Sequence, residues 1–471
     1  MFDSFPNAHS RIAPVRISRD SVVWPVSVRS LYWQRIAAAR CGNYRWLAVS
    51  FGDADLFTQT IRDLILMPAD TSSSAAGPLQ GLSVLEFSHT VMGPCAGLLL
   101  ADLGADVIKV EPPGGDKTRQ LTGFASGFYA TFNRNKRCIV VDLKSGDGQR
   151  LIHKLVANTD IVLDNYGPDT MDRLNCGWQS LKIRNEKLVY LSLKGFLAGP
   201  WQSRPALDEV VQFQSGLAYM TGPPGQPLRA GASVIDILGA VFGVTGVLAA
   251  LRERDATGVG QRVDSALFES AAFLMASHMT GGAATGAEIP PMTARKGAWG
   301  IYDVFHASDG TQLFIGVTSD SQWQRFCTHF ELHELLADTR LVSNTQRTAE
   351  REWLIPKLTE FCASLSYEEL LNGCTTADVS WSPVGCPEDL WQSEQLLSTG
   401  GLLETALNTA RDAVAASTLV PGLPLSFGDD CKRPLLHRQP PEAGQHSREV
   451  LAAANFDSAA IDQLIAAGVV E

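Results

Sequence analysis

Short apolar runs alternate with helical segments along the middle of the chain, and this order limits the fold more than any other feature. The runs are LSVLEF, DVIKVE, CIVVDL, DIVLDN and LVYLSL. Segments such as CAGLLLADLG and GDGQRLIHKLVANT stand between them and are typical of helices. Alternation of this kind predicts an α/β fold in which helices cover a parallel sheet.

The turns that follow these runs predict a binding cleft. In open parallel sheets ligands bind at the carboxyl ends of the strands, so SHTVMGP, EPPGGD, DNYGP and SLKGF should line one cleft. These turns lack G-x-G-x-x-G, and the chain lacks G-x-x-x-x-G-K-[ST], so a nicotinamide or ATP site is poorly supported. G-x-S-x-G is also missing from these turns, which disfavours a serine hydrolase. Basic side chains in this region suit phosphate groups, unless they are simply solvated: Lys109, Arg119, Arg134, Lys136, Arg137 and Arg173.

Size and composition narrow the class of protein. The 471 residues, 45% of them hydrophobic, suffice for one large or two ordinary domains. A net charge of −11 without basic runs disfavours nucleic acid as a partner. The nine cysteines are scattered without a C-x-x-C pair, so neither disulfides nor a zinc site is expected, and a reducing, cytoplasmic location fits best. The longest apolar stretch, 234–251, is interrupted by Asp236 and glycines and is shorter than the ~20 residues of a membrane span, so we expect no membrane segment.

Residues 1–76 differ from the rest of the chain. They contain several arginines, few acids before Asp53, and no clear alternation of strands and helices. Three interpretations remain open: a transit peptide, which would direct the protein to the mitochondrial matrix, an accessory element, or an upstream extension of the reading frame. We favour the extension, with Met67 as the natural start before the polar linker ADTSSSAAGP.

Asp236 is the one acid in the apolar run GASVIDILGAVFGVTGVLAAL. A carboxylate without partners is costly to bury, so a segment built only for packing would carry Ala, Ser or Leu there. One interpretation is an N-cap for a helix over 237–251. The other is an acid that faces a cleft, and the two are compatible because a helix start can border a cavity.

Several separated motifs resemble the class III CoA-transferase family, also called the CaiB/BaiF family. They include GLSVLEFSHTVMGPCAGLLLADLGADVIKVEPPGGDKTR, FNRNKRCIVVDLKSGDGQRL, VYLSLKGF and GVLAALRERDATGVGQRVDSALFES. DGTQLFIGV, SPVGCPEDL, GQHSREVL and AIDQLIAAGVV extend the likeness, so it covers about 81–470. The resemblance implies CoA esters as substrates, with no permanently bound cofactor and no metal.

The resemblance also implies a reaction and a nucleophile. In the transferases of this family an aspartate attacks the donor thioester and then carries CoA as an aspartyl-CoA thioester, and the matching aspartate here is Asp236. A carboxylate suits this role because it is ionised at neutral pH without a separate base. Two alternatives stay open: a 2-methylacyl-CoA racemase, and a non-catalytic acyl-CoA-binding relative.

Asp208 is the second acid that the resemblance singles out. The racemases of the family are implied to use an acid at this position in proton transfer, whereas a structural interpretation is an N-cap for the helix EVVQFQSGLAYM. The racemases also place a histidine on the strand before it, and this chain has no histidine between Asp160 and Asp208. The racemase alternative is therefore disfavoured.

For CoA, the likeness implies contacts from Thr90, Val91, Lys109, Asn165, Tyr166 and Arg173. Formyl-CoA enzymes often have glutamine where this chain has Val91, which disfavours a formyl-CoA and oxalate pair. Their glycine-rich loop is matched only in part by HMTGGAATGAE, which is either a lid or a plain linker. Arg295 is a hypothetical anchor for a dicarboxylic acid, because guanidinium pairs with carboxylate, unless it is a solvated loop residue. Dicarboxylate substrates are weakly favoured.

The expected architecture follows the family. It has a large Rossmann-like parallel-sheet domain over 77–280, a smaller α/β domain over 295–395, and a C-terminal segment over 396–471 that returns to the large domain. The resemblance further implies an interlocked homodimer.

Overall fold

The computed structural model describes residues 77–294, 297–407 and 415–471. The predicted extension 1–76, its Met67 start and the hypothetical anchor Arg295 lie outside the described residues. The following account concerns the compact unit formed by 77–423 and 435–471.

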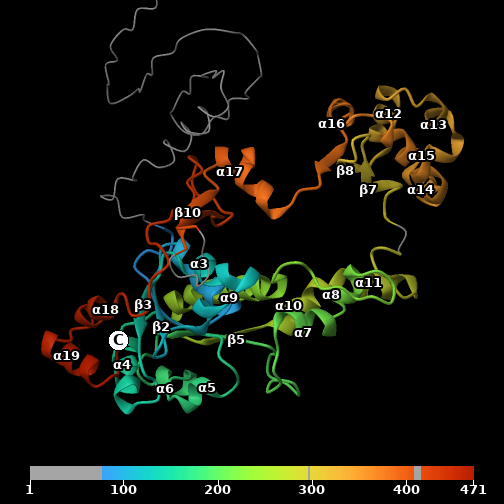
Figure 1. Ribbon diagram of the computed structural model, residues 1–471. Coiled ribbons are helices and arrows are strands. Elements are labelled where there is room, and N and C mark those ends of the chain that lie inside the picture. The colour runs from blue at the N-terminus through green and yellow to red at the C-terminus, as the bar shows by residue number, and fades with distance from the viewer. Residues whose placement is uncertain (1–76, 295–296, 408–414) are drawn as a thin grey trace, which may run out of the picture. The chain divides into compact units, whose positions relative to one another are not determined.

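A six-stranded sheet lies at the centre of this unit and confirms the predicted α/β class (Figure 1). All of its neighbouring strands are parallel, in the order β3-β2-β1-β4-β5-β6. The strands are short and mostly apolar because helices cover both faces of such a sheet. Their bounds are β1 Ser83–Phe87, β2 Asp106–Glu111, β3 Arg137–Val140, β4 Ile161–Asp164, β5 Val189–Lys194 and β6 Arg262–Ala266.

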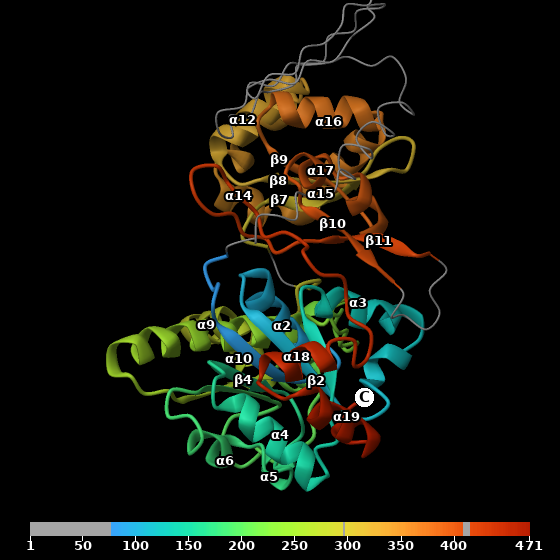
Figure 2. The ribbon, with the colours of Figure 1, turned by 90° about the vertical axis from the view of Figure 1, so that its left-hand side faces the viewer.

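Helices lie on both faces of the sheet (Figure 2). Their apolar side chains form two hydrophobic clusters, one on each face. Successive residues of β1 point in opposite directions, so Val84 joins one cluster and Leu85 the other. The first cluster contains α2 (Met92–Asp102), α9 (Val234–Thr257) and α10 (Leu267–Leu274). The second contains α4 (Gly146–Val156), α6 (Trp178–Lys182), α18 (Ser447–Ala453) and α19 (Ser458–Ala466).

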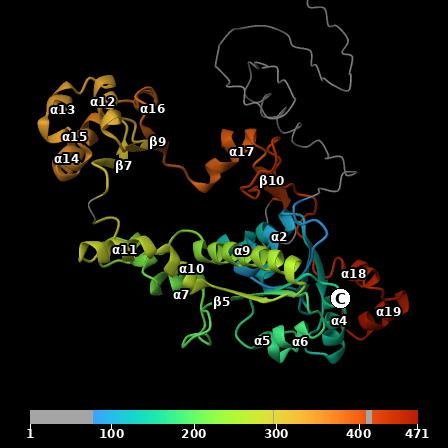
Figure 3. The same cartoon turned by 180° about the vertical axis from the view of Figure 1, so that it is seen from behind.

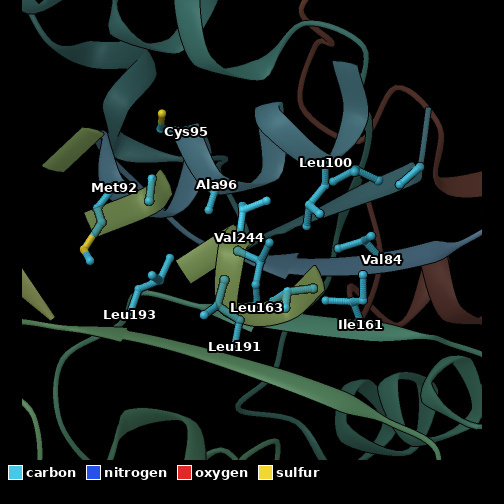
Figure 4. Close-up of a cluster of buried hydrophobic side chains, with 14 of the residues drawn as sticks. Val84, Met92, Cys95, Ala96, Leu100, Ile161, Leu163, Leu191, Leu193 and Val244 are labelled. Atoms are coloured by element: carbon cyan, nitrogen blue, oxygen red, sulfur yellow. The ribbon is translucent and has the colours of Figure 1, made fainter. Parts of the chain in front are cut away.

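Helix α9 lies on the sheet through its small residues. Figure 4 shows Val244 of this helix among Ala96 of α2, Leu163 of β4 and Leu191 of β5. At Gly246 a Cβ atom would lie 2.6 Å from the Cγ1 of the β-branched Val263, so glycine allows α9 to lie close to β6. The glycines of this run therefore serve packing.

The observed α9 corrects the sequence analysis on length. It has 24 residues rather than the 15 of the predicted segment 237–251. By length and hydropathy this helix could cross a membrane. The length of the apolar stretch is therefore no reason to exclude a membrane span. Its packing on β5, β6 and α2 gives its apolar composition a structural reason.

A separate hydrophobic cluster lies within the predicted small domain (Figure 3). It joins an antiparallel three-stranded sheet to helices through Trp323, Phe326 and Leu358. Its elements are β7 (Ile301–His306), β8 (Gln312–Val317), β9 (Ser380–Pro383), α12 (Asp320–His329), α13 (His333–Ala337), α14 (Asn344–Ala349), α15 (Arg351–Ala363) and α16 (Tyr367–Thr376). A two-stranded sheet follows, formed by β10 (Leu402–Ala406) and β11 (Ser417–Pro421).

Two other segments bear on the predictions. Much of HMTGGAATGAE belongs to helix α11 (Ala276–Thr285), so it is not the flexible loop or plain linker that the sequence suggested. At the C-terminal end, Val470 forms a β-bridge with Val141, and the His446 N–H donates to the Cys138 carbonyl. The last residues thus lie against strand β3 of the large sheet.

Candidate active site

The loops after β1 and β4 meet where the strand order of the sheet reverses. The chain leaves these adjacent strands toward opposite sides, which creates the crevice in which such sheets bind ligands. Asn165, after β4, ties the two loops together. Its side-chain amide donates to the His89 carbonyl at 2.9 Å and accepts from the His89 N–H at 3.0 Å. Asn165 therefore shapes the crevice through the backbone of the neighbouring loop.

The loop after β1 is held in a strained conformation. Thr90 has φ of 66°, a left-handed value that a β-branched residue rarely adopts, and its N–H donates to the Thr118 Oγ1 at 2.9 Å. At Gly93 a Cβ would lie 2.6 Å from the Ser88 Cβ and 2.7 Å from the Asn165 Cγ. Strain held by surrounding structure is typical of ligand sites, and Thr90 lines the crevice.

A cavity of about 690 Å³ occupies this crevice. Its volume lies in the range of small-molecule sites, ~300–1,000 Å³. Both acids singled out in the sequence line it, as do Thr90, Val91 and Tyr166. Apolar side chains form much of the remaining wall: Met92, Phe124, Phe128, Leu193, Ala206, Leu207 and Leu267. A flexible thioester with a small acyl group fits such a mixed lining.

Asp236 lies in the first turn of α9, two residues after the helix begins at Val234. It is not the N-cap that the sequence allowed. Among the described residues no side chain or backbone group donates a hydrogen bond to its carboxylate, which faces the cavity. Burial, together with the negative charges of Asp208 and Glu209, raises the pKa of Asp236 to about 7. A pKa near 7 leaves part of the Asp236 side chains protonated at neutral pH, in contrast to the full ionisation expected from the sequence.

Asp208 caps the helix that carries Asp236. Its Oδ2 accepts the backbone N–H of Ile235 at 2.7 Å and that of Asp236 at 2.9 Å. These are the second and third N–H groups that an N-cap side chain normally satisfies, and Ser233, the residue at the cap position, makes no such bond. The predicted N-cap role within its own segment is wrong, because Asp208 is the first residue of α7 (Asp208–Gln214) and makes no capping bond there.

Lys109 does not line the cavity. Its side chain is fully buried, with Nζ 2.8 Å from the Ser88 carbonyl oxygen and 3.1 Å from the Asp116 Oδ2. Although burial opposes its charge, the adjacent carboxylates of Asp116 and Glu86 raise the pKa of Lys109. The Lys109 ammonium therefore holds the loop after β1 through Ser88, and it does not reach the cavity.

The other basic side chains noted in the sequence also lie away from the cavity. Four of them pair with acids inside the protein: Arg119 with Glu111, Arg134 with Asp102, Lys136 with Glu86, and Arg137 with Asp106 and Glu449. Arg173 is exposed at the end of α5 (Thr170–Arg173) and bonds the Thr170 hydroxyl at 2.9 Å. Of the predicted CoA contacts, Thr90, Val91, Asn165 and Tyr166 do line the cavity.

Arg204 is a cavity residue that the sequence analysis missed. Its guanidinium carbon lies 5.2 Å from the Trp201 ring centre and 5.6 Å from that of Phe196. No carboxylate within the described ranges pairs with it, whereas Lys194, the other strong base of the cavity, pairs with Asp164. The available signal was an arginine four residues before Asp208 in a loop rich in Gly and Pro.

Comparisons with known proteins identify the family of the chain. A family model of CoA-transferase family III matches residues 79–447. The chain belongs to this family. The succinate–glutarate CoA-transferase of Agrobacterium fabrum is 32% identical over 80% of this chain and 95% of its own length. The acetyl-CoA:oxalate CoA-transferase of Acetobacter aceti is 31% identical over 78% of this chain and 94% of its own. A solved CaiB/BaiF family protein from Brucella suis superposes with a TM-score of 0.70 at 29% identity, covering 81% of this chain and all of that one.

Family membership makes this protein an enzyme of CoA transfer that uses CoA thioesters as substrates. In open α/β sheets ligands bind in the crevice where the strand order reverses, and the cavity described above lies there. In the part of the chain that the structure describes, no group of three or more His, Cys, Asp or Glu residues is arranged to hold a metal.

Proposed function

We propose that the protein moves CoA from an acyl-CoA donor to a carboxylic acid through an aspartyl-CoA thioester on Asp236. The observation that carries this proposal is the Asp236 carboxylate itself. It faces the cavity without a hydrogen-bonding partner among the described residues, while its backbone is fixed by Asp208. An unpartnered, rigidly placed carboxylate is what a nucleophile requires.

The steps balance without an external base or redox partner. An Asp236 oxygen attacks the thioester carbonyl, the C–S bond breaks, and CoA leaves as a thiolate while a mixed anhydride remains. The thiolate attacks the Asp236 carbonyl carbon, which releases the donor acid and leaves aspartyl-CoA. The incoming carboxylate then attacks that carbon, CoA leaves again, and the thiolate takes the new acyl group. Asp236 returns as a carboxylate.

We further propose dicarboxylic acids as acceptors, with Arg204 as the group that binds the second carboxylate. The relatives named above act on glutarate or oxalate. Arg204 lines the cavity that contains Asp236, and a guanidinium that pairs with no carboxylate among the described residues is suited to a bidentate carboxylate pair. The Trp201 and Phe196 rings restrict its side chain and so lower the entropy lost on binding.

We also propose a homodimer, as the resemblance implies. Exposed apolar side chains of α9 recur at helical spacing at Ile237, Val241 and Leu248, and Phe273 of α10 is exposed as well. An apolar face of this kind is typical of protein interfaces. Light scattering measures the association state, and a monomeric protein would refute the proposed homodimer.

The activity is tested with a panel of acyl-CoA donors against mono- and dicarboxylic acids, with products identified by mass spectrometry. We expect new acyl-CoA species that contain the acceptor acid, with succinyl-CoA and a dicarboxylic acid as the best pair. Formyl-CoA with oxalate as the best pair would overturn the substrate proposal. Exchange of the α-proton of a 2-methylacyl-CoA without CoA transfer would favour the racemase alternative.

A further inference from the structure

One buried amide side chain joins helix α7 to the segment that leads into the nucleophile. Gln212 has no solvent exposure and lies one helical turn after Asp208, so both side chains are on the same face of α7. Its Oε1 accepts the Ala230 N–H at 2.9 Å, and its Nε2 donates to the Asp208 Oδ1. The other oxygen of Asp208 accepts from the backbone at Ile235 and Asp236.

The orientation of this amide follows from its partners. The backbone N–H of Ala230 can only donate, so the Gln212 atom that it meets must be the oxygen. The NH₂ group then faces the Asp208 Oδ1, which accepts its hydrogen bond. Gln212 therefore needs both a donor and an acceptor. Glutamate would bring an acceptor against an acceptor, and methionine would supply no comparable donor.

Gln212 and Asp208 hold the segment 230–236 at its two ends, and we call this pair the clamp. Gln212 holds the start of this segment at Ala230, and Asp208 holds its end at Asp236. Between these ends, residues 231–233 form no helix or strand, and a local backbone bond runs from the Val234 N–H to the Ala232 carbonyl at 2.8 Å. We propose that Gln212 is a positioning residue for CoA transfer, which holds the segment 230–236 and the Asp208 carboxylate so that Asp236 stays aligned with the thioester.

This inference rests on the proposed function of Asp236, but the clamp itself can be tested separately. The charged groups near Gln212 determine how a negative charge introduced at this position would affect Asp236. On α7, Glu209 pairs with Arg229 at 3.3 Å. On α10, which also packs against α7, Glu269 accepts the Leu197 N–H. On α9 the facing acid is Asp236. A carboxylate at position 212 would thus add to the negative charge that Asp236 already experiences.

The experiment compares Gln212→Met, which keeps the size, with Gln212→Glu, which keeps the shape and adds a charge. Gln214→Glu is the matched control, because it puts the same charge on the same helix at a side chain outside the Asp208 hydrogen bonds. Each full-length variant is compared with wild type by thermal melting, by hydrogen exchange of the peptide covering 230–236, and by transfer kinetics across pH. The exchange measurement reports on the clamp even where no activity is detected.

We expect faster exchange over 230–236 in both Gln212 variants and wild-type exchange in Gln214→Glu. In Gln212→Met, kcat should fall about 100-fold with the donor KM within a few-fold, because alignment rather than binding is lost. In Gln212→Glu the acidic limb of the kcat/KM profile should move to higher pH. Wild-type exchange and kcat in Gln212→Met would overturn the inference, as would an unmoved profile in a folded Gln212→Glu protein. If wild type itself transfers no CoA, the proposed function fails, while the exchange result still decides the clamp.

Discussion

The Asp208 Oδ2 lies 2.9 Å from the backbone nitrogen of Asp236, so one acid of the cavity caps the helix that carries the other. This contact acts on Asp236 in two ways. It fixes the backbone of Asp236, and it places a second carboxylate near that of Asp236, which adds to the effect of burial in raising the pKa of Asp236. A basic carboxylate is a stronger nucleophile once it is ionised, so both effects favour attack on a thioester.

Substitution of Asp208 should separate these two effects. In Asp208→Ala the N–H groups of Ile235 and Asp236 lose their acceptor, so the free energy of unfolding should fall by about 1–2 kcal/mol. We also expect kcat to fall about 100-fold, because Asp236 is no longer held in place. Asp208→Asn keeps an acceptor oxygen but loses the charge, so the acidic limb of its rate profile should move to lower pH. Denaturant titration and pH-dependent kinetics give these values. Wild-type behaviour of Asp208→Ala would show that the cap has no role.

The rate of CoA transfer should depend on pH through Asp236. Burial first, and then the charges of Asp208 and Glu209, raise its pKa to about 7. Since the ionised form attacks, kcat/KM should rise as the pH increases through about 7 and level off above it, with about a tenfold loss for each unit below. Stopped assays in overlapping buffers measure this profile. A rate that stays constant from pH 5 to pH 8 in such buffers would contradict the role of Asp236.

The same raised pKa makes a prediction about stability. The folded protein binds a proton at Asp236 more tightly than the unfolded chain does, so this group lowers stability as the pH rises from about 4 to about 7. Asp236→Asn removes the effect, and its Tm at pH 8 should exceed that of wild type by about 2–4 °C, with the difference closing toward pH 4. Glu360→Gln, on an exposed helix surface, is the control for simple loss of charge. A lower Tm for Asp236→Asn at pH 8 would be inconsistent with an unpaired buried carboxylate.

Much of the fold was predictable because alternating strands and helices admit few arrangements. Short runs such as DVIKVE, with their β-branched residues, favour strands, and the parallel sheet follows from the helices between them. The importance of Asp236 was also predictable, because a carboxylate among small apolar residues is costly unless it has a structural or functional role. Its pKa was not, because burial and the approach of Asp208 are tertiary effects.

Other parts of the site could not be read from the sequence. Lys109 is a basic residue of the kind that binds phosphate. Only its burial against Ser88 and Asp116 shows that it has a structural role. In the sequence Asp208 precedes a predicted helix as N-caps do, yet in the structure it is the first residue of α7 and accepts the Ile235 N–H of α9, 27 residues away. In both cases a residue type suits several roles, and long-range packing selects one of them.

Arg204 should determine the preference for dicarboxylic acids. With a donor whose acyl group carries no second carboxylate, Arg204→Ala should raise the KM for glutarate about 10- to 100-fold and leave that for butyrate within a few-fold, because the charge-assisted pair with the second carboxylate is lost. Arg184→Ala, at an exposed arginine that does not line the cavity, is the matched control. An increase in KM for the CoA donor instead would assign Arg204 to a phosphate of CoA.

Covalent trapping tests the nucleophile most directly. The protein is incubated with succinyl-CoA and no acceptor, treated with hydroxylamine, digested, and the peptide containing Asp236 is sequenced by mass spectrometry. The account predicts a hydroxamate on Asp236 in wild type and none in Asp236→Asn, which keeps the size of the side chain but cannot attack. Modification of another residue, or an unmodified Asp236 in an enzyme that transfers CoA, would contradict it.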